Sequence, residues 1–141
     1  MIRKYGLYVV WVVAFLGMLG SLYVSDILNI EPCSLCWYQR ICLYPLAIIA
    51  GRAAWLGFHG IAAYLMPQTW IGFGIALYHV AIQGFPTWHP ISLSSAGPNC
   101  AIPVSLGLGF FTLPILSAIV FAIINALLFA IWRISKKDSS K

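Results

Sequence analysis

Charged side chains are scarce in this chain. Of its 141 residues, 8% are charged and only three are acidic, whereas 62% are hydrophobic. A soluble globular domain carries about a quarter charged residues, so the composition excludes that class. The formal net charge of +5 could suggest a nucleic-acid partner, but the basic residues lie at the ends of apolar stretches, which indicates a membrane protein instead. Internal repeats, low-complexity runs and linkers are also lacking, so we expect a single domain over residues 1–141.

Four apolar stretches have the length of about 20 residues that a helix needs to cross a bilayer. They are about 6–24, 37–58, 61–83 and 108–132. They predict an all-α membrane protein, a four-transmembrane-helix bundle with outer loops at about 25–36 and 84–107. The first stretch is longer than the apolar part of a signal peptide and lacks a clean cleavage site, so we expect a retained helix. Its small residues Gly17, Gly20 and Ser21 would let a neighbouring helix approach closely.

The basic residues predict how the bundle is oriented, because Lys and Arg concentrate in cytoplasmic segments. With four spans, both termini and the 52–60 connection share one side. That side holds all but one of the eight basic residues, namely Arg3, Lys4, Arg52, Arg133, Lys136, Lys137 and Lys141. We therefore predict cytoplasmic termini and two loops on the outer side. Arg40 is the exception.

Three of the four cysteines, Cys33, Cys36 and Cys100, fall on the predicted outer side, where disulfides persist. Cys42 lies two turns into the second span, and we expect it to act as a small hydrophobe. The Cys33-Ser34-Leu35-Cys36 pair opens that helix, where unpaired N–H groups and the positive end of the helix dipole stabilise a thiolate. Thiolates attack disulfides. By spacing alone the pair equally fits a static disulfide or half of a zinc site.

Polar residues near the pair favour redox chemistry. Arg40 follows Cys36 by four positions, so both lie on one helical face about one turn apart. An arginine at the edge of the apolar layer is costly without a partner, although it can also extend to the headgroups. Beside Cys36, Arg40 could favour a thiolate and donate a hydrogen bond to a membrane-soluble electron acceptor. His79, near the end of the third span, is expected at a similar depth, and Gln39 is a weaker candidate that could instead face headgroups.

The run Pro32-Cys33-Ser34-Leu35-Cys36-Trp37-Tyr38-Gln39-Arg40, followed by Tyr44-Pro45, closely resembles the DsbB/BdbC family of disulfide-bond formation proteins. The resemblance covers the whole chain, and the short basic N-terminus is most similar to the Gram-positive BdbC branch. It implies a multi-pass enzyme of the bacterial cell membrane. Such an enzyme reoxidises an extracytoplasmic thioredoxin-like partner of the DsbA/BdbD kind.

The resemblance also implies roles for individual residues. Cys33 and Cys36 would receive electrons from the second outer loop and pass them to a quinone, with menaquinone favoured over ubiquinone. Cys33 would be the thiol that exchanges with the loop, and Cys36 the thiol beside the quinone. Arg40, His79 and Gln39 match the family's quinone-side residues. The match of His79 rests on the run Leu77-Tyr78-His79-Val80-Ala81-Ile82-Gln83, which resembles the family less closely than the CxxC run does.

The second outer loop departs from the family pattern, which has two cysteines there. This chain has only Cys100, and counting back by the spacing of the BdbC branch gives Ser94. We predict a deliberate Cys→Ser change that holds one intermediate; the alternative is a natural member with a shortened relay. In either case turnover should be impaired, because serine forms no disulfide. Cys100 is then predicted to bond Cys33 and leave Cys36 as a thiolate, the alternative being a Cys33–Cys36 disulfide.

Two other functions compete with this one. A vitamin K epoxide reductase-like protein also has a quinone-facing CxxC, but there the motif opens the last core helix, whereas here it opens the second. A non-catalytic membrane protein could hold zinc through Cys33, Cys36, Cys100 and His89, since Cys₃His is a known zinc ligand set. The oxidising outer side and the positive charge of Arg40 disfavour a bound dication, so we predict no metal site.

Overall fold

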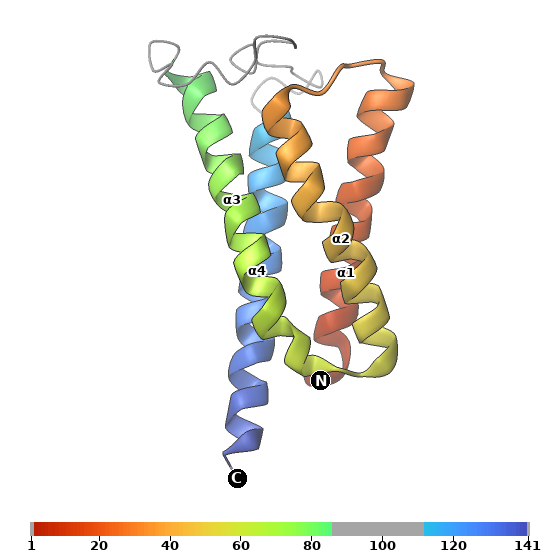
Figure 1. Cartoon of the computed structure of the whole chain (residues 1–141), viewed down its shortest axis with the longest axis vertical. Helices are drawn as coiled ribbons and strands as arrows, with labels where there is room; N and C mark the ends of the chain where they lie inside the picture. The colour runs from red at the N-terminus through yellow and green to blue at the C-terminus, as the bar shows by residue number, and fades with distance from the viewer. Residues whose placement is uncertain (1, 86–111, 141) are drawn as a thin grey trace.

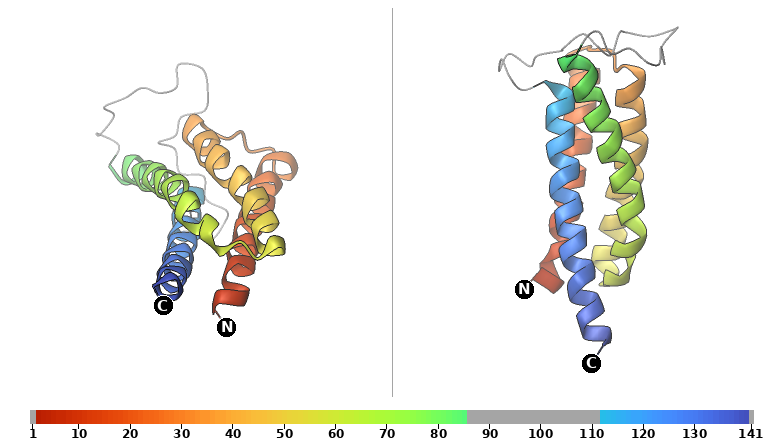
Figure 2. Two further views of the ribbon diagram at one scale, coloured as in Figure 1. Left: turned by 60° about the horizontal axis from the view of Figure 1, so that its bottom comes forward. Right: turned by 90° about the vertical axis from the view of Figure 1, so that its left-hand side faces the viewer.

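The computed structural model of the chain describes residues 2–85 and 112–140, and these form helices and no strand. The elements are α1 (Ile2–Leu22), a π-helical turn (Tyr23–Ile27), α2 (Ser34–Leu56), a 3₁₀ turn (His59–Ile61), α3 (Ala62–Gly84) and α4 (Leu113–Ser139). The four helices run alternately up and down (Figures 1 and 2). Both chain ends lie at one end of the bundle, and α2 begins at the other, which we call the cysteine end. The predicted all-α four-helix membrane bundle is confirmed.

Several helix ends differ from the predicted ones. The first helix continues through Ile27 as a π-helical turn, and α2 begins at Ser34, so the connection predicted at 25–36 shrinks to 28–33. The early start of α2 has a local cause: Cys33 is an extended N-cap residue, and the Trp37 N–H donates to its carbonyl at 3.1 Å. At the other end of the chain, α4 continues past 132 to Ser139, because a helix does not have to stop where its apolar stretch stops.

The helix α2 is the least apolar of the four. By length and composition the spans Tyr5–Ile27, His59–Gly84 and Leu113–Lys137 of the described chain can each cross a membrane, and α2 does not meet that test because it contains Gln39, Arg40 and Arg52. Its 23 residues are nevertheless about 35 Å long at about 1.5 Å per residue. It packs along both α1 and α3, so it crosses the same thickness as they do.

Small residues allow the helices to pack closely, which matters because lipid supplies no hydrophobic force between helices. A Cβ at Gly72 of α3 would lie 2.5 Å from the Phe121 ring of α4, and one at Gly51 of α2 would lie 2.5 Å from Trp11 of α1. Gly17, predicted as a close-approach residue, has Leu43 within 3.2 Å of such a Cβ. The same prediction is wrong for Gly20, where an added Cβ would meet nothing within 4 Å.

A buried pair of polar side chains joins α3 to α4 in the middle of the bundle. The Thr69 hydroxyl donates to Asn125 Oδ1 at 2.6 Å, and Asn125 Nδ2 donates to the Thr69 carbonyl at 3.3 Å. Both residues are buried, where a polar group without a partner costs free energy. The two hydrogen bonds therefore fix the register of α4 against α3.

This pair can be tested with a double-mutant cycle. We expect Thr69→Val and Asn125→Leu to be coupled by about 0.6 kcal/mol, and by no more than about 1.7 kcal/mol, the range measured for hydrogen bonds between membrane helices. The free energy of unfolding in mixed micelles measures the coupling. As a control, Ser117→Ala should add to Asn125→Leu without coupling, because the Ser117 hydroxyl donates within α4 to the Pro114 carbonyl. Purely additive effects at 69 and 125 would contradict the assignment.

Candidate functional site

Cys33 and Cys36 lie together at the start of α2. Cys33 is the N-cap residue and Cys36 lies in the first turn, where backbone N–H groups have no helical partner and the helix dipole favours negative charge. The two Sγ atoms are 3.6 Å apart, whereas a disulfide is about 2.05 Å long. In this conformation the two sulfurs are thus in contact and not bonded to each other.

His79 reaches the same point from α3. Its Nε2 lies 3.7 Å from Cys33 Sγ, and its side chain is only 2% exposed. Its Nδ1 lies 3.5 Å from Nε2 of Gln39, which is buried and does not face headgroups. The direction of that hydrogen bond depends on the imidazole tautomer. We call Cys33, Cys36 and His79 the thiol–imidazole cluster.

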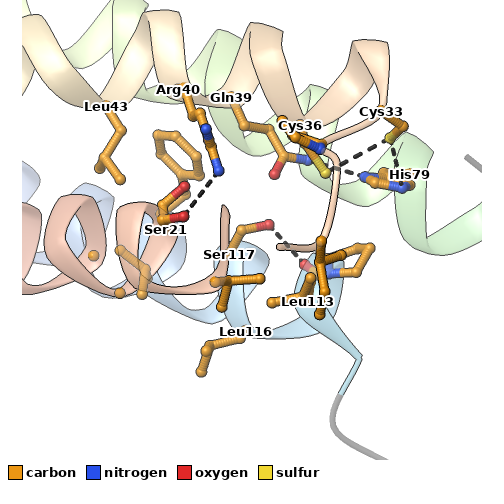
Figure 3. A pocket seen from close by; sticks show the side chains of 18 of the residues that line it. Ser21, Cys33, Cys36, Gln39, Arg40, Leu43, His79, Leu113, Leu116 and Ser117 are labelled. Carbon is orange, nitrogen blue, oxygen red and sulfur yellow. Dashed lines mark hydrogen bonds between the residues drawn. The ribbon is translucent and has the colours of Figure 1, made fainter. Parts of the chain in front are cut away.

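Arg40 turns away from this cluster toward α1 (Figure 3). Its Nη2 donates to the Ser21 carbonyl at 2.8 Å and also to the Ser25 hydroxyl, which itself donates to the Ser21 carbonyl at 3.2 Å. The guanidinium also lies 5.6 Å from the centre of the Trp37 ring, within cation–π range. Arg40 therefore has polar partners that offset the free-energy cost of a charged side chain in an apolar layer.

The sequence predicted that Arg40 needs a partner but did not identify Ser21 and Ser25. The available signal was two small polar residues four positions apart, near the end of the first span and at the depth of Arg40. One donor stays unmatched: Arg40 Nε is buried, and no described residue accepts its hydrogen bond.

A cavity of about 800 Å³ lies among the four helices at the cysteine end, and Figure 3 shows its lining. Its size is typical of small-molecule sites, which are mostly apolar with a few placed polar groups. We call it the thiol cavity. The polar, charged and thiol side chains on its wall are Ser21, Tyr23, Glu31, Cys33, Cys36, Gln39, Arg40, His79, Gln83 and Ser117, and the other lining residues are apolar or glycine.

Comparisons with known proteins identify the family of the chain. The family model "Disulfide bond formation protein DsbB" matches residues 3–133. The chain belongs to this family. It is 45% identical to a probable disulfide formation protein of Chlamydia muridarum, over 92% of this chain and 95% of that one. It is 42% identical to disulfide bond formation protein C of Bacillus subtilis, over 84% of this chain and 86% of that one. No solved structure matches the chain.

Membership of the DsbB family confirms the predicted resemblance and implies disulfide oxidoreductase activity in a membrane protein. It favours this function over the vitamin K epoxide reductase-like and non-catalytic alternatives. Ser94, Cys100 and His89 lie outside the described residues. The predicted Cys33–Cys100 bond and the role of Ser94 therefore stay predictions. Four of the predicted site residues, Cys33, Cys36, Gln39 and His79, lie in one contact group, with Arg40 beside it on the cavity wall.

The two thiols should differ in reactivity. Cys33 is 7% exposed, between Cys36 and His79, whereas Cys36 is partly exposed. In the reduced full-length protein we expect N-ethylmaleimide to alkylate Cys36 several-fold faster than Cys33, measured by site-resolved mass spectrometry. The control His59→Ala, at the other end of the bundle, should leave the ratio of the two rates unchanged. Faster alkylation of Cys33 in the unmodified protein would contradict the arrangement.

Proposed function

We propose that this protein reoxidises an extracytoplasmic thioredoxin-like partner and passes the electrons through Cys33 and Cys36 to a membrane quinone, with menaquinone favoured. The observation that carries the proposal is that both sulfur-bearing residues line a largely apolar cavity of about 800 Å³ within a membrane bundle. Family membership supports the thiol–disulfide half of the reaction. The cavity supports the quinone half.

The residues of the thiol cavity suit a quinone. Its aliphatic wall, which includes Val13, Leu16 and Val120, matches an apolar ring and tail. A quinone carbonyl accepts hydrogen bonds, and Arg40 is a guanidinium donor on the cavity wall. We therefore assign Arg40 to hold the carbonyl, with Gln39 and His79 as neighbouring polar groups. When bound, a quinone supplies a sink for two electrons and two protons.

The proposed reaction has two steps, a thiol–disulfide exchange with the partner and an oxidation of the Cys33 and Cys36 thiols. In the first, the partner's dithiol becomes a disulfide as one disulfide of this protein is reduced to two thiols. In the second, Cys33 and Cys36 form an S–S bond and lose two electrons and two protons. In the Nδ1–H tautomer, for which the Gln39 amide turns its Oε1 toward Nδ1, His79 Nε2 at 3.7 Å from Cys33 Sγ would take the Cys33 proton as that sulfur bonds to Cys36. The start of α2 stabilises Cys36 as thiolate before the bond forms.

The second loop explains why we expect slow turnover with the partner. In the family pattern its leading cysteine receives the partner's attack, and this chain has Ser94 there. Cys100 is proposed to bond Cys33, in keeping with an arrested intermediate. We also propose a bacterial cell membrane location with cytoplasmic termini. The supporting observation is that the end of the bundle holding both chain ends carries Arg52, Arg133, Lys136 and Lys137.

Restoring the loop cysteine tests the partner reaction. We expect Ser94→Cys to raise the rate of partner oxidation well above that of the unmodified chain, because a loop disulfide can then form. Fluorescence or gel-shift assays of the partner's thiols measure that rate. Non-reducing peptide mapping of the unmodified chain should find Cys33 linked to Cys100. Unchanged activity of Ser94→Cys would mean that the loop pair has been misplaced.

Filling the thiol cavity tests the quinone reaction. A Cβ at Gly20, on the cavity wall, would meet nothing within 4 Å, so Gly20→Leu should occupy quinone space without disturbing the helices. We expect KM for the quinone to rise about tenfold, equivalent to about 1.4 kcal/mol. Gly74→Leu is the matched control, because Gly74 is equally open but lies outside the cavity wall. Equal effects of the two changes, or quinone reduction that survives Cys36→Ala, would contradict the proposal.

A further inference from the structure

The thiol–imidazole cluster has the composition of a metal site. The Sγ atoms of Cys33 and Cys36 and a ring nitrogen of His79 all lie within 4.8 Å of one another. We propose that this cluster, in its dithiol form, binds one thiophilic d¹⁰ ion, Zn²⁺ in the first place, with the fourth position open to the thiol cavity. This site differs from the Cys33, Cys36, Cys100 and His89 set weighed above, and it does not depend on the quinone reaction.

The spacing of the donor atoms fits tetrahedral coordination. With Zn–S of about 2.3 Å and Zn–N of about 2.0–2.1 Å, a tetrahedral ion holds two sulfurs about 3.8 Å apart and a sulfur and nitrogen about 3.6 Å apart. The measured separations are 3.6 Å between the two Sγ atoms and 3.7 Å between Cys33 Sγ and His79 Nε2. Two of the three ligand separations therefore match the ion, and the third, between Cys36 Sγ and a ring nitrogen of His79, is within 4.8 Å.

The residue behind His79 also suits a ligand role. Metal-bound histidines almost always use their second ring nitrogen to donate to a nearby acceptor, which fixes the tautomer. Gln39 lies 3.5 Å from Nδ1 of His79. A half-turn of its amide, which exchanges two groups of nearly equal shape, presents Oε1 as that acceptor. Nε2 then keeps its lone pair toward the two sulfurs.

Charge permits the ion despite the nearby arginine. Two thiolates balance a divalent cation, so the occupied cluster is neutral. The Arg40 guanidinium is engaged by Ser21 of α1 and Ser25 of the π-helical turn, and it turns away from the sulfurs. The argument that Arg40 excludes a dication therefore weakens once its direction is known.

The site exists only in one redox state. A disulfide between Cys33 and Cys36 removes both thiolate ligands, so the oxidised protein should not bind the ion. Conversely, a bound ion occupies both sulfurs and keeps them reduced. Zinc would therefore act as a reversible inhibitor that selects the reduced enzyme.

Co²⁺ and Cd²⁺ are suitable probes, since thiolate ligation of each gives charge-transfer absorption and tetrahedral Co²⁺ adds a visible band. The full-length protein in detergent, reduced, without oxygen or quinone, should bind one equivalent of Co²⁺, and Zn²⁺ should displace it. The oxidised protein should bind none. Cys36→Ser should abolish the signal and His79→Ala should weaken binding at least tenfold. Gln39→Leu should weaken it about 10–100-fold, as is typical for outer-shell partners.

Control variants separate this site from its alternatives. Cys42→Ser, His59→Ala, Cys100→Ser and His89→Ala should each retain binding. His79→Cys should also retain it, with stronger charge-transfer absorption from a third sulfur, a gain that misfolding cannot produce. Absence of binding by the reduced unmodified protein would overturn the proposal. So would binding that survives His79→Ala but is lost in Cys100→Ser or His89→Ala. Because the assay contains no quinone, neither failure bears on the proposed electron transfer.

Discussion

Polar groups within an apolar layer must be satisfied by other groups of the protein, and the cysteine end of this bundle depends on that constraint. Arg40 is the most demanding case, because a charged side chain at membrane depth is costly without partners. The Ser21 carbonyl and the Ser25 hydroxyl supply them, and Ser25 lies in the π-helical turn that ends the first span. The connection to α2 follows directly, so the arginine's requirement helps to fix where the thiol pair begins.

Two adjacent residues of α2, Gln39 and Arg40, bind different neighbouring helices. Successive helical residues are separated by about 100° around the axis, so Gln39 and Arg40 can point at different helices. Gln39 contacts His79 of α3, and Arg40 donates to α1. Together they hold the start of α2 between its two neighbours at a fixed rotation. The thiol cavity occupies the space enclosed with α4, and its wall combines these bonded residues with others such as Gly20 and Leu116.

The sequence predicted the helices and the depth of the site in the membrane, but not how each helix is rotated about its axis. Apolar length located four spans, and counting along antiparallel helices put His79 at the level of Cys36. Helix ends were less predictable, since the π-helical turn and the extension of α4 to Ser139 depend on local hydrogen bonding and not on hydropathy. The partners of Arg40 were missed because Ser21 and Ser25 resemble ordinary packing residues until the rotation of the first helix is known.

The contact between the Cys33 and Cys36 sulfurs allows two reactions that exclude each other, namely disulfide formation and the proposed metal binding. Forming a disulfide must bring the two Sγ atoms from 3.6 Å to about 2.05 Å, whereas an ion needs both sulfurs as separate thiolates. The two reactions therefore exclude each other at one pair of side chains. The dithiol that gives its electrons to an acceptor is also the form that is open to thiophilic metals.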